Sequence, residues 1–254
     1  DDVLNIVEGL FTEMLPKVAP HKKLLCSPWP KLTYNEALDR FGSDKPDLRF
    51  GMELIDLGSL FAGSDFKVFQ TVLQNGGVIK GLIIPGSASF SRKEIDDLTT
   101  IARDQGAAGL ATVALTAEGV KGTIQRFVTE SQLANLKSEF GLKQDDLLLI
   151  VADKRSVANK ALGALRLHFR DRLNLADPNI MAFSWVVDFP MFEWNKEEER
   201  WEAAHHMFTM PQIEHLDEFD KDPAGILSDA YDMVGNGYEL ASGSIRIHRR
   251  DIQY

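Results

Sequence analysis

The chain has 254 residues, of which 28 are Lys or Arg and 38 are Asp or Glu, so its formal net charge is −10 with neutral histidines. Hydrophobic residues make up 44% and charged residues 26%, which is typical of folded globular chains and excludes a disordered or low-complexity protein. A protein that coats nucleic acid without sequence specificity needs a basic surface, so the net negative charge argues against that class. A local basic groove is still compatible with this net charge.

Three features of the sequence bear on the cellular compartment. Cys26 is the only cysteine, so neither an intramolecular disulfide nor a thiolate metal cluster can form. No apolar run approaches the roughly 18 residues that a membrane-spanning helix needs. The first residues, Asp1 and Asp2, are acidic where a signal peptide would be basic. We therefore expect a cytoplasmic protein without a membrane-spanning segment.

The N-terminal segment predicts one amphipathic helix and then irregular structure. Its apolar residues recur at spacings of three and four, which puts them on one helical face: Val3, Ile6, Val7, Leu10 and Met14. Pro16 is expected to end regular structure. Thr33 precedes Glu36 by three residues, the spacing of a capping box at the start of a short helix. The following polar segment, 41–50, is predicted to be a turn.

Strands and helices alternate from about residue 65. Apolar, β-branched runs predict strands at 78–84, 109–115 and 147–151. Ser91 and Glu94 form a second capping-box pattern before a helix. Apolar periodicity predicts two more helices, one around 133–140 and one over 156–173. These elements make up an α/β module of roughly 100 residues, the size of a domain.

The C-terminal third is predicted to be richer in strands. Residues 181–187 form a strongly apolar strand, and 193–201 form a charged hairpin or loop. The glycines at 235 and 237 only superficially match a dinucleotide fingerprint, because a helix is expected before them and strands after them. Residues 238–248 are predicted to form a β-hairpin that turns at Ser242-Gly243.

That predicted hairpin would carry charged side chains on one face. Glu239 would pair with Arg246, and His248 would lie on the same face. Without further context, such a pair is more simply a surface ion pair, worth under about 1 kcal/mol. Asp232 stands seven residues before Glu239. Two carboxylates beside substrate phosphates can hold Mg²⁺, whereas the simpler alternative for Asp232 is a solvated residue at a helix end.

His205 and His206 are adjacent in the sequence. In an extended segment their side chains would point to opposite faces, so one metal ion would not easily bind both. We therefore favour a loop that contacts an anionic ligand or a substrate carboxylate over a zinc site. The simplest alternative is a pair of solvated loop histidines.

Four separated segments carry a family resemblance when they are taken together. They are 34–50, which contains Phe41-Gly42-Ser43-Asp44-Lys45-Pro46-Asp47-Leu48-Arg49; Trp185-Val186-Val187-Asp188-Phe189-Pro190-Met191-Phe192; His205-His206-Met207-Phe208-Thr209; and 231–239 running into Gly243-Ser244-Ile245-Arg246-Ile247-His248. In this order they resemble the bacterial-type aspartyl-tRNA synthetases, which are class II aminoacyl-tRNA synthetases. The resemblance extends over essentially the whole chain.

The resemblance implies an α+β fold. Residues 1–64 and 175–254 would be segments of the antiparallel β-sheet core of a class II catalytic domain. Residues 65–174 would be an α/β insertion domain, similar to one in a subunit of the tRNA-dependent amidotransferase. Because the chain lies between the positions of class II motifs 2 and 3 and lacks the anticodon-binding domain, we expect an internal fragment with little or no aminoacylation activity of its own.

The resemblance also implies the activity of an aspartate-tRNA ligase: ATP-dependent activation of L-aspartate to aspartyl-AMP, then transfer to tRNA, by a homodimer of the full-length protein. Arg246 would grip the side-chain carboxylate of aspartate. His205 would contact aspartate, with His206 in the same strip. Glu239 would bind ATP, through Mg²⁺ shared with Asp232.

Some residues depart from the family pattern, and other functions compete with this one. Ala241 and Ser242 stand where glycines are usual, and Met207 stands where Pro usually precedes Phe208. One rival function is a noncatalytic, tRNA-contacting module built around the insertion domain. Another is a stable structural fragment that binds nothing well.

Overall fold

The computed structural model describes residues 2–214 and 221–253. The chain divides into two compact units. Unit 1 comprises Asp1–Ala37, Asp44–Arg49 and Asp177–Tyr254, and unit 2 comprises Leu38–Ser43 and Phe50–Ala176. None of the helices in the described residues is long and apolar enough to cross a membrane.

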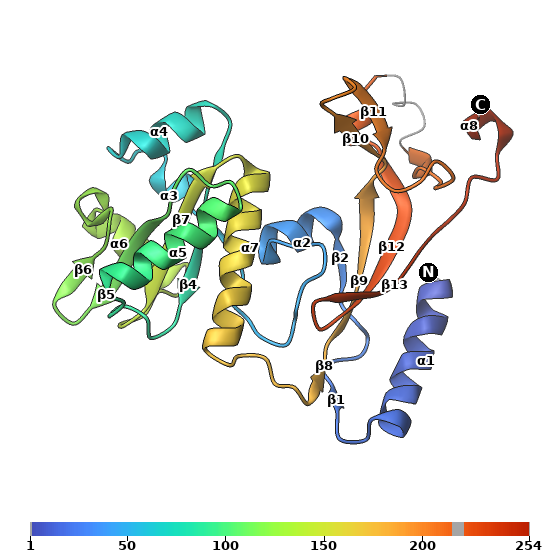
Figure 1. Ribbon diagram of the computed structural model, residues 1–254, viewed down its shortest axis with the longest axis horizontal. Coiled ribbons are helices and arrows are strands. Elements are labelled where there is room, and N and C mark those ends of the chain that lie inside the picture. The colour runs from blue at the N-terminus through green and yellow to red at the C-terminus, as the bar shows by residue number, and fades with distance from the viewer. Residues whose placement is uncertain (1, 215–220, 254) are drawn as a thin grey trace. The chain divides into compact units, whose positions relative to one another are not determined.

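Unit 1 is built on a four-stranded sheet (Figure 1). Its order is β13 (Tyr238–Ser244), β12 (Leu227–Gly235), β9 (Phe183–Pro190) and β2 (Lys31–Thr33). β12 pairs antiparallel with both of its neighbours, whereas β2 pairs parallel with β9. The chain therefore forms the antiparallel sheet expected from the family resemblance, with one parallel edge strand.

The predicted hairpin at Ser242-Gly243 is wrong. Residues 238–244 form one continuous strand, and the turn lies at Asn236-Gly237, between β12 and β13. Asn236 has φ 54° and Gly237 has φ 87°. Two consecutive residues with positive φ suit the tight turn that matches the twist of a hairpin, and Asn-Gly is its preferred sequence. The segment before Gly235 is accordingly a strand and not the helix that we expected.

Helix α1 (Asp2–Val18) covers one face of this sheet. The helix is confirmed, but most of its predicted buried face is wrong: Val7 packs against the cluster described below, whereas Val3, Ile6 and Leu10 are exposed. A different stripe of α1 faces the sheet, and its Phe11 packs against the rings of Trp29 and Phe183. The buried cluster consists of Leu4, Leu15, Trp29, Phe183, Trp185 and Met233. Pro16 lies inside the helix instead of ending it.

Smaller elements complete unit 1. β1 (Lys23–Leu24) pairs with β8 (Ile180–Met181), and β10 (Phe192–Asn195) pairs with β11 (Arg200–Ala203), which confirms the charged hairpin. The remaining elements are the 3₁₀ turn η3 (Pro223–Gly225) and helix α8 (Arg250–Gln253). Helix α2 (Tyr34–Phe41) begins in unit 1, and its residues from Leu38 onward belong to unit 2. It starts with the predicted capping box, in which Thr33 and Glu36 exchange hydrogen bonds of 2.8 and 3.1 Å.

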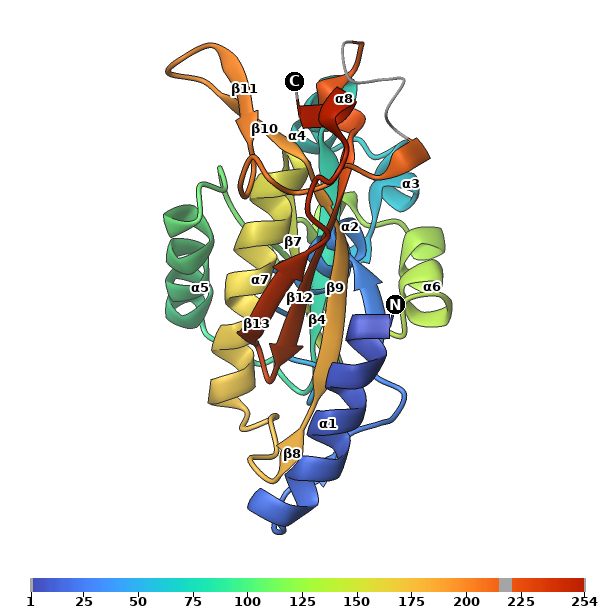
Figure 2. The same cartoon turned by 90° about the vertical axis from the view of Figure 1, so that its right-hand side faces the viewer.

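Unit 2 is a five-stranded antiparallel sheet between two layers of helices. The strand order is β3 (Ile55–Asp56), β4 (Val78–Ile84), β7 (Leu147–Asp153), β5 (Ala111–Thr116) and β6 (Gly119–Lys121). α5 (Arg92–Asp104) and α7 (Arg155–Arg172) lie on one side, and α3 (Gly58–Phe61), α4 (Lys67–Gln74) and α6 (Glu130–Ser138) lie on the other (Figure 2). The 3₁₀ turn η1 (Gln125–Phe127) precedes α6.

The strands and helices predicted in this module are confirmed, including the capping box at Ser91. Unit 2 also takes in residues 50–64, which we had placed with the first segment. The reason is local packing: β3 pairs with β4, and Leu57 and Phe61 are fully buried in the core between the sheet and its second helical layer.

Arg166 ties the chain around residue 50 to α7 within unit 2. Its guanidinium is almost fully buried and donates hydrogen bonds of 3.0 to 3.1 Å to the carbonyl oxygens of Phe50, Gly51 and Met52. It also lies over the Phe50 ring, 4.0 Å from the centroid. A buried arginine is tolerated because these carbonyls and the ring replace the lost water contacts.

Candidate functional site

The predicted site residues lie on the sheet face of unit 1 that is opposite α1. Met233 and Tyr231 belong to the cluster that packs against α1. Because side chains alternate along a strand, Asp232 points to the other face. A cavity of about 150 Å³ opens there. Four of the five predicted site residues line it, namely His205, His206, Asp232 and Arg246, and Glu239 does not.

The segment 205–210 carries the two histidines and is called the histidine strip below. Its second half runs alongside residues 245–247. Met210 donates its backbone N–H to Ile245 at 2.8 Å, and Ile247 donates to Phe208 at 2.9 Å. Thr209 and Arg246 form an isolated antiparallel bridge between these hydrogen bonds. The predicted Glu239–Arg246 pair is therefore wrong, because Arg246 lies beyond β13 and pairs with the histidine strip instead.

The guanidinium of Arg246 lies against His206. Its Nη1 is 3.0 Å from Nδ1 of His206, and the backbone N–H of Phe208 donates to the same nitrogen at 3.2 Å. Two donors to Nδ1 favour the tautomer in which Nε2 carries the proton. In the part of the chain that the structure describes, Arg246 makes no ion pair with a carboxylate. Its charge is thus available to an anionic ligand in the cavity.

His205 and His206 both line the cavity, so the expectation that they point to opposite faces is wrong. The alternation rule applies to strands, whereas His205 lies in a bend and His206 directly follows it, outside any strand. His205 packs its ring edge-on against Phe189 with ring centroids 5.0 Å apart. The arrangement supports our preference for ligand contact, since both rings and Arg246 face one small cavity.

The acidic side of the site contains a lysine that we did not predict. Nζ of Lys45 lies 2.7 Å from a carboxylate oxygen of Asp44 and 3.3 Å from one of Glu239. Lys45 belongs to the polar turn of 41–50, one of the four segments that carried the resemblance, and this was the only signal in the sequence. Its proximity to Glu239 depends on the fold of unit 1.

Asp232 is buried on β12, so the alternative of a solvated residue at a helix end is wrong. Burial raises the pKa of its carboxyl from the ordinary 3.8 to about 6. The charges of Glu239 and Asp44 add to the rise, and the charge of Lys45 opposes it. A buried carboxylate beside another carboxylate is stabilised by any cation that reaches both.

This raised pKa predicts that the contribution of Asp232 to folding stability falls as pH rises. The unfolded chain loses the Asp232 proton near pH 4, whereas the folded chain keeps it until about pH 6. Between these values the folded state binds more protons, so the free energy of unfolding decreases with pH, by about 2 to 3 kcal/mol in all. We expect Asp232→Asn to remove this decrease in urea titrations at pH 4, 5, 6 and 7.

The matched control is Asp104→Asn, at the exposed C-terminal end of α5. It should keep the wild-type dependence of unfolding free energy on pH. A wild-type profile that coincides with that of Asp232→Asn over this range would contradict the prediction.

The carboxylate side chains of Asp232 and Glu239 are of the chemical type that binds a magnesium ion. The described residues contain no group of three or more His, Cys, Asp or Glu side chains that could hold a metal ion by themselves. Mg²⁺ does not need such a cage, because it commonly takes one or two carboxylates and completes its shell with water and substrate phosphates. The mutual repulsion of Asp232 and Glu239 is the feature that a divalent cation would relieve.

The residues that depart from the family pattern are accommodated here. Ser242 pairs with Asp232 across the two strands and lines the cavity, and Ala241 pairs with Met233. Met207 is 67% exposed, so a proline is not needed at that position to fill space.

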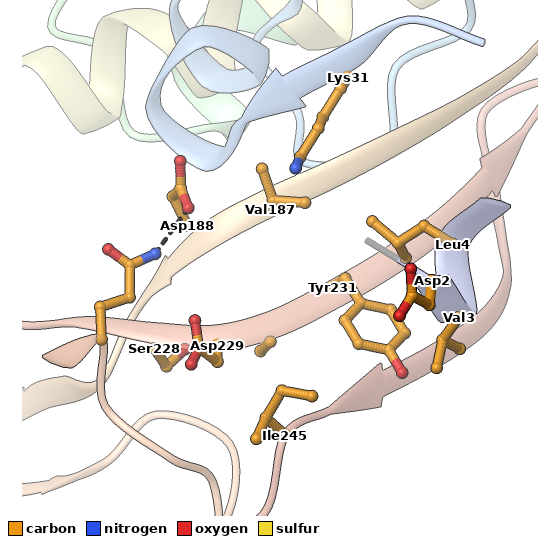
Figure 3. Close-up of a pocket in the computed structure, with 12 residues that line it drawn as sticks. Asp2, Val3, Leu4, Lys31, Val187, Asp188, Ser228, Asp229, Tyr231 and Ile245 are labelled. Atoms are coloured by element: carbon orange, nitrogen blue, oxygen red, sulfur yellow. Dashed lines mark hydrogen bonds between the residues drawn. The ribbon is translucent and has the colours of Figure 1, made fainter. Parts of the chain in front are cut away.

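A second cavity, of about 310 Å³, lies on the α1 side of the sheet (Figure 3). Lys31, Asp188 and Tyr231 are among the residues that line it, and Nε2 of Gln212 donates to Asp188 at 2.7 Å. None of the predicted site residues lies there. The chemistry expected from the sequence therefore belongs to the smaller cavity.

Comparison with known proteins gives a consistent result. Residues 1–254 match the family model described as tRNA synthetases class II (D, K and N). The chain is 48% identical over 253 residues to an aspartate–tRNA(Asp/Asn) ligase of Rubrobacter xylanophilus and 49% identical to one of Moorella thermoacetica. It is 43% identical over 254 residues to an aspartate–tRNA ligase of Shouchella clausii. Each match covers the whole chain but only 42 to 43% of the relative.

Proposed function

Because this chain belongs to the class II tRNA synthetases (D, K and N), we propose that it is part of an aspartate–tRNA ligase. Such an enzyme activates L-aspartate with ATP to aspartyl-AMP and transfers the aspartyl group to tRNA. Unit 1 is then a segment of the catalytic core, and unit 2 is the insertion domain. The observation that carries the proposal is the small cavity in which Arg246 and two histidines face Asp232.

Arg246 is the group that selects the substrate. A guanidinium binds a carboxylate through two parallel, charge-assisted hydrogen bonds. Asparagine offers a neutral amide instead, and the unmatched charge of Arg246 would then oppose binding. Nδ1 of His206 holds the guanidinium from one side, and His205 contacts aspartate from the neighbouring bend. His205 and His206 together complete the aspartate end of the pocket.

Glu239 and Asp232 serve the nucleotide end. They would hold Mg²⁺, which neutralises phosphate charge while the α-carboxylate of aspartate attacks the α-phosphorus and pyrophosphate leaves. The charge of Glu239 helps to raise the pKa of Asp232, a repulsion that a cation near both carboxylates would relieve, and this supports the role. Lys45 lies beside Glu239, so the nucleotide end carries both signs of charge.

Further parts of the proposal concern partners and compartment. We assign tRNA, L-aspartate and ATP as ligands, a homodimer as the full-length assembly, and the cytoplasm as the location. Cys26 is an exposed free thiol, which suits a reducing compartment. Unit 2 has hydrophobic cores of its own on both faces of its sheet, which also suits the alternative of a separate tRNA-contacting module.

The chain alone is expected to charge tRNA at less than about one thousandth of the rate of a full-length relative. It spans about 42% of the length of those relatives, and phosphoryl-transfer catalysis depends on many charge clamps acting together. The measurement is aminoacylation of tRNA with radiolabelled aspartate, with the full-length Moorella thermoacetica ligase as the positive control. A rate near that of the full-length ligase would contradict the fragment assignment.

A further inference from the structure

Lys45 is surrounded by negative charge at the nucleotide end of the site. Its ammonium makes ion pairs with Asp44 at 2.7 Å and Glu239 at 3.3 Å. Lys45 thus already gives Glu239, one of the two proposed metal ligands, part of the positive charge that a divalent cation would bring.

The loop that carries Lys45 is held firmly. The next residue but one, Asp47, has a fully buried carboxylate that accepts hydrogen bonds from the Arg49 side chain at 2.7 and 2.9 Å and from the Arg49 backbone N–H at 3.1 Å. A side-chain carbon at Gly237 would lie only 3.3 Å from Cβ of Asp47. The loop therefore packs closely on the β12–β13 turn at Asn236-Gly237, which lies four residues after Asp232 and two before Glu239 in the chain.

An ordinary surface ion pair in the same chain shows the contrast. Lys121 pairs with Glu118 at 2.6 Å, with side chains that are 56% and 78% exposed, whereas those of Lys45 and Glu239 are 34% and 38% exposed. Lys121 stabilises a single neighbouring carboxylate on a tight turn. Lys45 is more protected from solvent and forms ion pairs with two carboxylates, those of Asp44 and Glu239.

From this arrangement we infer that Lys45 is a tethered stand-in for the divalent cation: it pairs with Glu239 while the metal is absent and must be displaced when the metal binds. The inference rests on the proposed role of Asp232 and Glu239 as metal ligands. Its consequence is that Lys45 weakens metal binding to the protein before the nucleotide arrives, because the entering ion competes with an ammonium that is already in place.

The test is a Mn²⁺ titration of the chain, read by the electron paramagnetic resonance signal of free Mn²⁺. Lys45→Met removes the charge and keeps the length of the side chain, and we expect it to bind Mn²⁺ about fivefold more tightly, the equivalent of a partly exposed ion pair. Lys45→Arg retains the charge and should bind like the wild type. Lys121→Met removes the lysine of the Lys121–Glu118 pair in unit 2 and should also leave the affinity unchanged.

Two further variants separate this inference from the proposed function. Glu239→Gln and Asp232→Asn should each weaken Mn²⁺ binding if these carboxylates are the ligands. If they do and Lys45→Met binds no more tightly than the wild type, the stand-in role of Lys45 is overturned while the metal site stands. If neither weakens binding, or if no variant binds Mn²⁺, both the metal site and the role of Lys45 are overturned. Circular dichroism spectra of all variants would show that the fold is kept.

Discussion

Replacing Arg246 with alanine is expected to weaken binding of a nonhydrolysable aspartyl-adenylate analogue by at least about 100-fold. The guanidinium faces the cavity, and among the described residues it makes no ion pair of its own. Its loss removes two charge-assisted hydrogen bonds to the ligand carboxylate, each worth roughly 1.5 to 3 kcal/mol. Isothermal titration calorimetry of the chain in Mg²⁺ buffer measures the affinity directly.

Two companion variants make that result specific. Arg246→Lys keeps the charge but not the planar fork, so it should recover only part of the affinity. Arg249→Ala removes a nearby exposed arginine that pairs with Asp251, and it should bind the analogue like the wild type. Equal affinity of Arg246→Ala and the wild type would remove Arg246 from the aspartate site. Failure of both to bind the analogue would mean that the pocket exists only when class II motifs 2 and 3 close it.

Arg166→Ala is expected to destabilise unit 2 by about 3 to 5 kcal/mol. The substitution leaves three backbone carbonyls of residues 50–52 without their donor and opens a cavity beneath the Phe50 ring. Each unsatisfied buried acceptor costs roughly 1 to 3 kcal/mol, although these costs do not simply add. Urea unfolding followed by far-ultraviolet circular dichroism should show the shift.

The chain contains a matched control for this variant on the same helix. Arg172 pairs with Glu94 and has a side chain that is 36% exposed, so Arg172→Ala should cost less than about 1 kcal/mol. Tryptophan fluorescence follows the unfolding of unit 1 separately, because all four tryptophans lie in that unit. An unfolding midpoint for Arg166→Ala equal to that of Arg172→Ala would show that the buried hydrogen bonds contribute little.

Local patterns predicted the elements of unit 2 well. Its apolar runs coincide with β4 and β7, and the predicted capping box at Ser91 is present. Such patterns succeed because a strand buried on both faces and a capped helix end are each specified by a few neighbouring residues. The short α3 and the whole of α4 were missed, since the sequence before residue 78 offered no capping box.

In unit 1 the sequence pattern misled us at two points. Residues 238–248 alternate like a hairpin, but the Asn-Gly turn that joins β12 to β13 lies earlier, at 236–237. In α1, apolar residues occupy more than one stripe, and periodicity alone chose the exposed one. In both cases the sequence allows two local arrangements, two turn positions or two helix stripes. Packing against other parts of the chain determines which of the two forms.

By itself, the sequence determined the family, the order of most elements, and the residue types at the site, because these depend on short motifs and local periodicity. Only the tertiary structure decided which side chains meet. Arg246 lies beside His206 rather than Glu239, and Lys45 lies beside Glu239. These contacts join residues far apart in the chain, and they follow from strand register and loop packing, which no local pattern specifies.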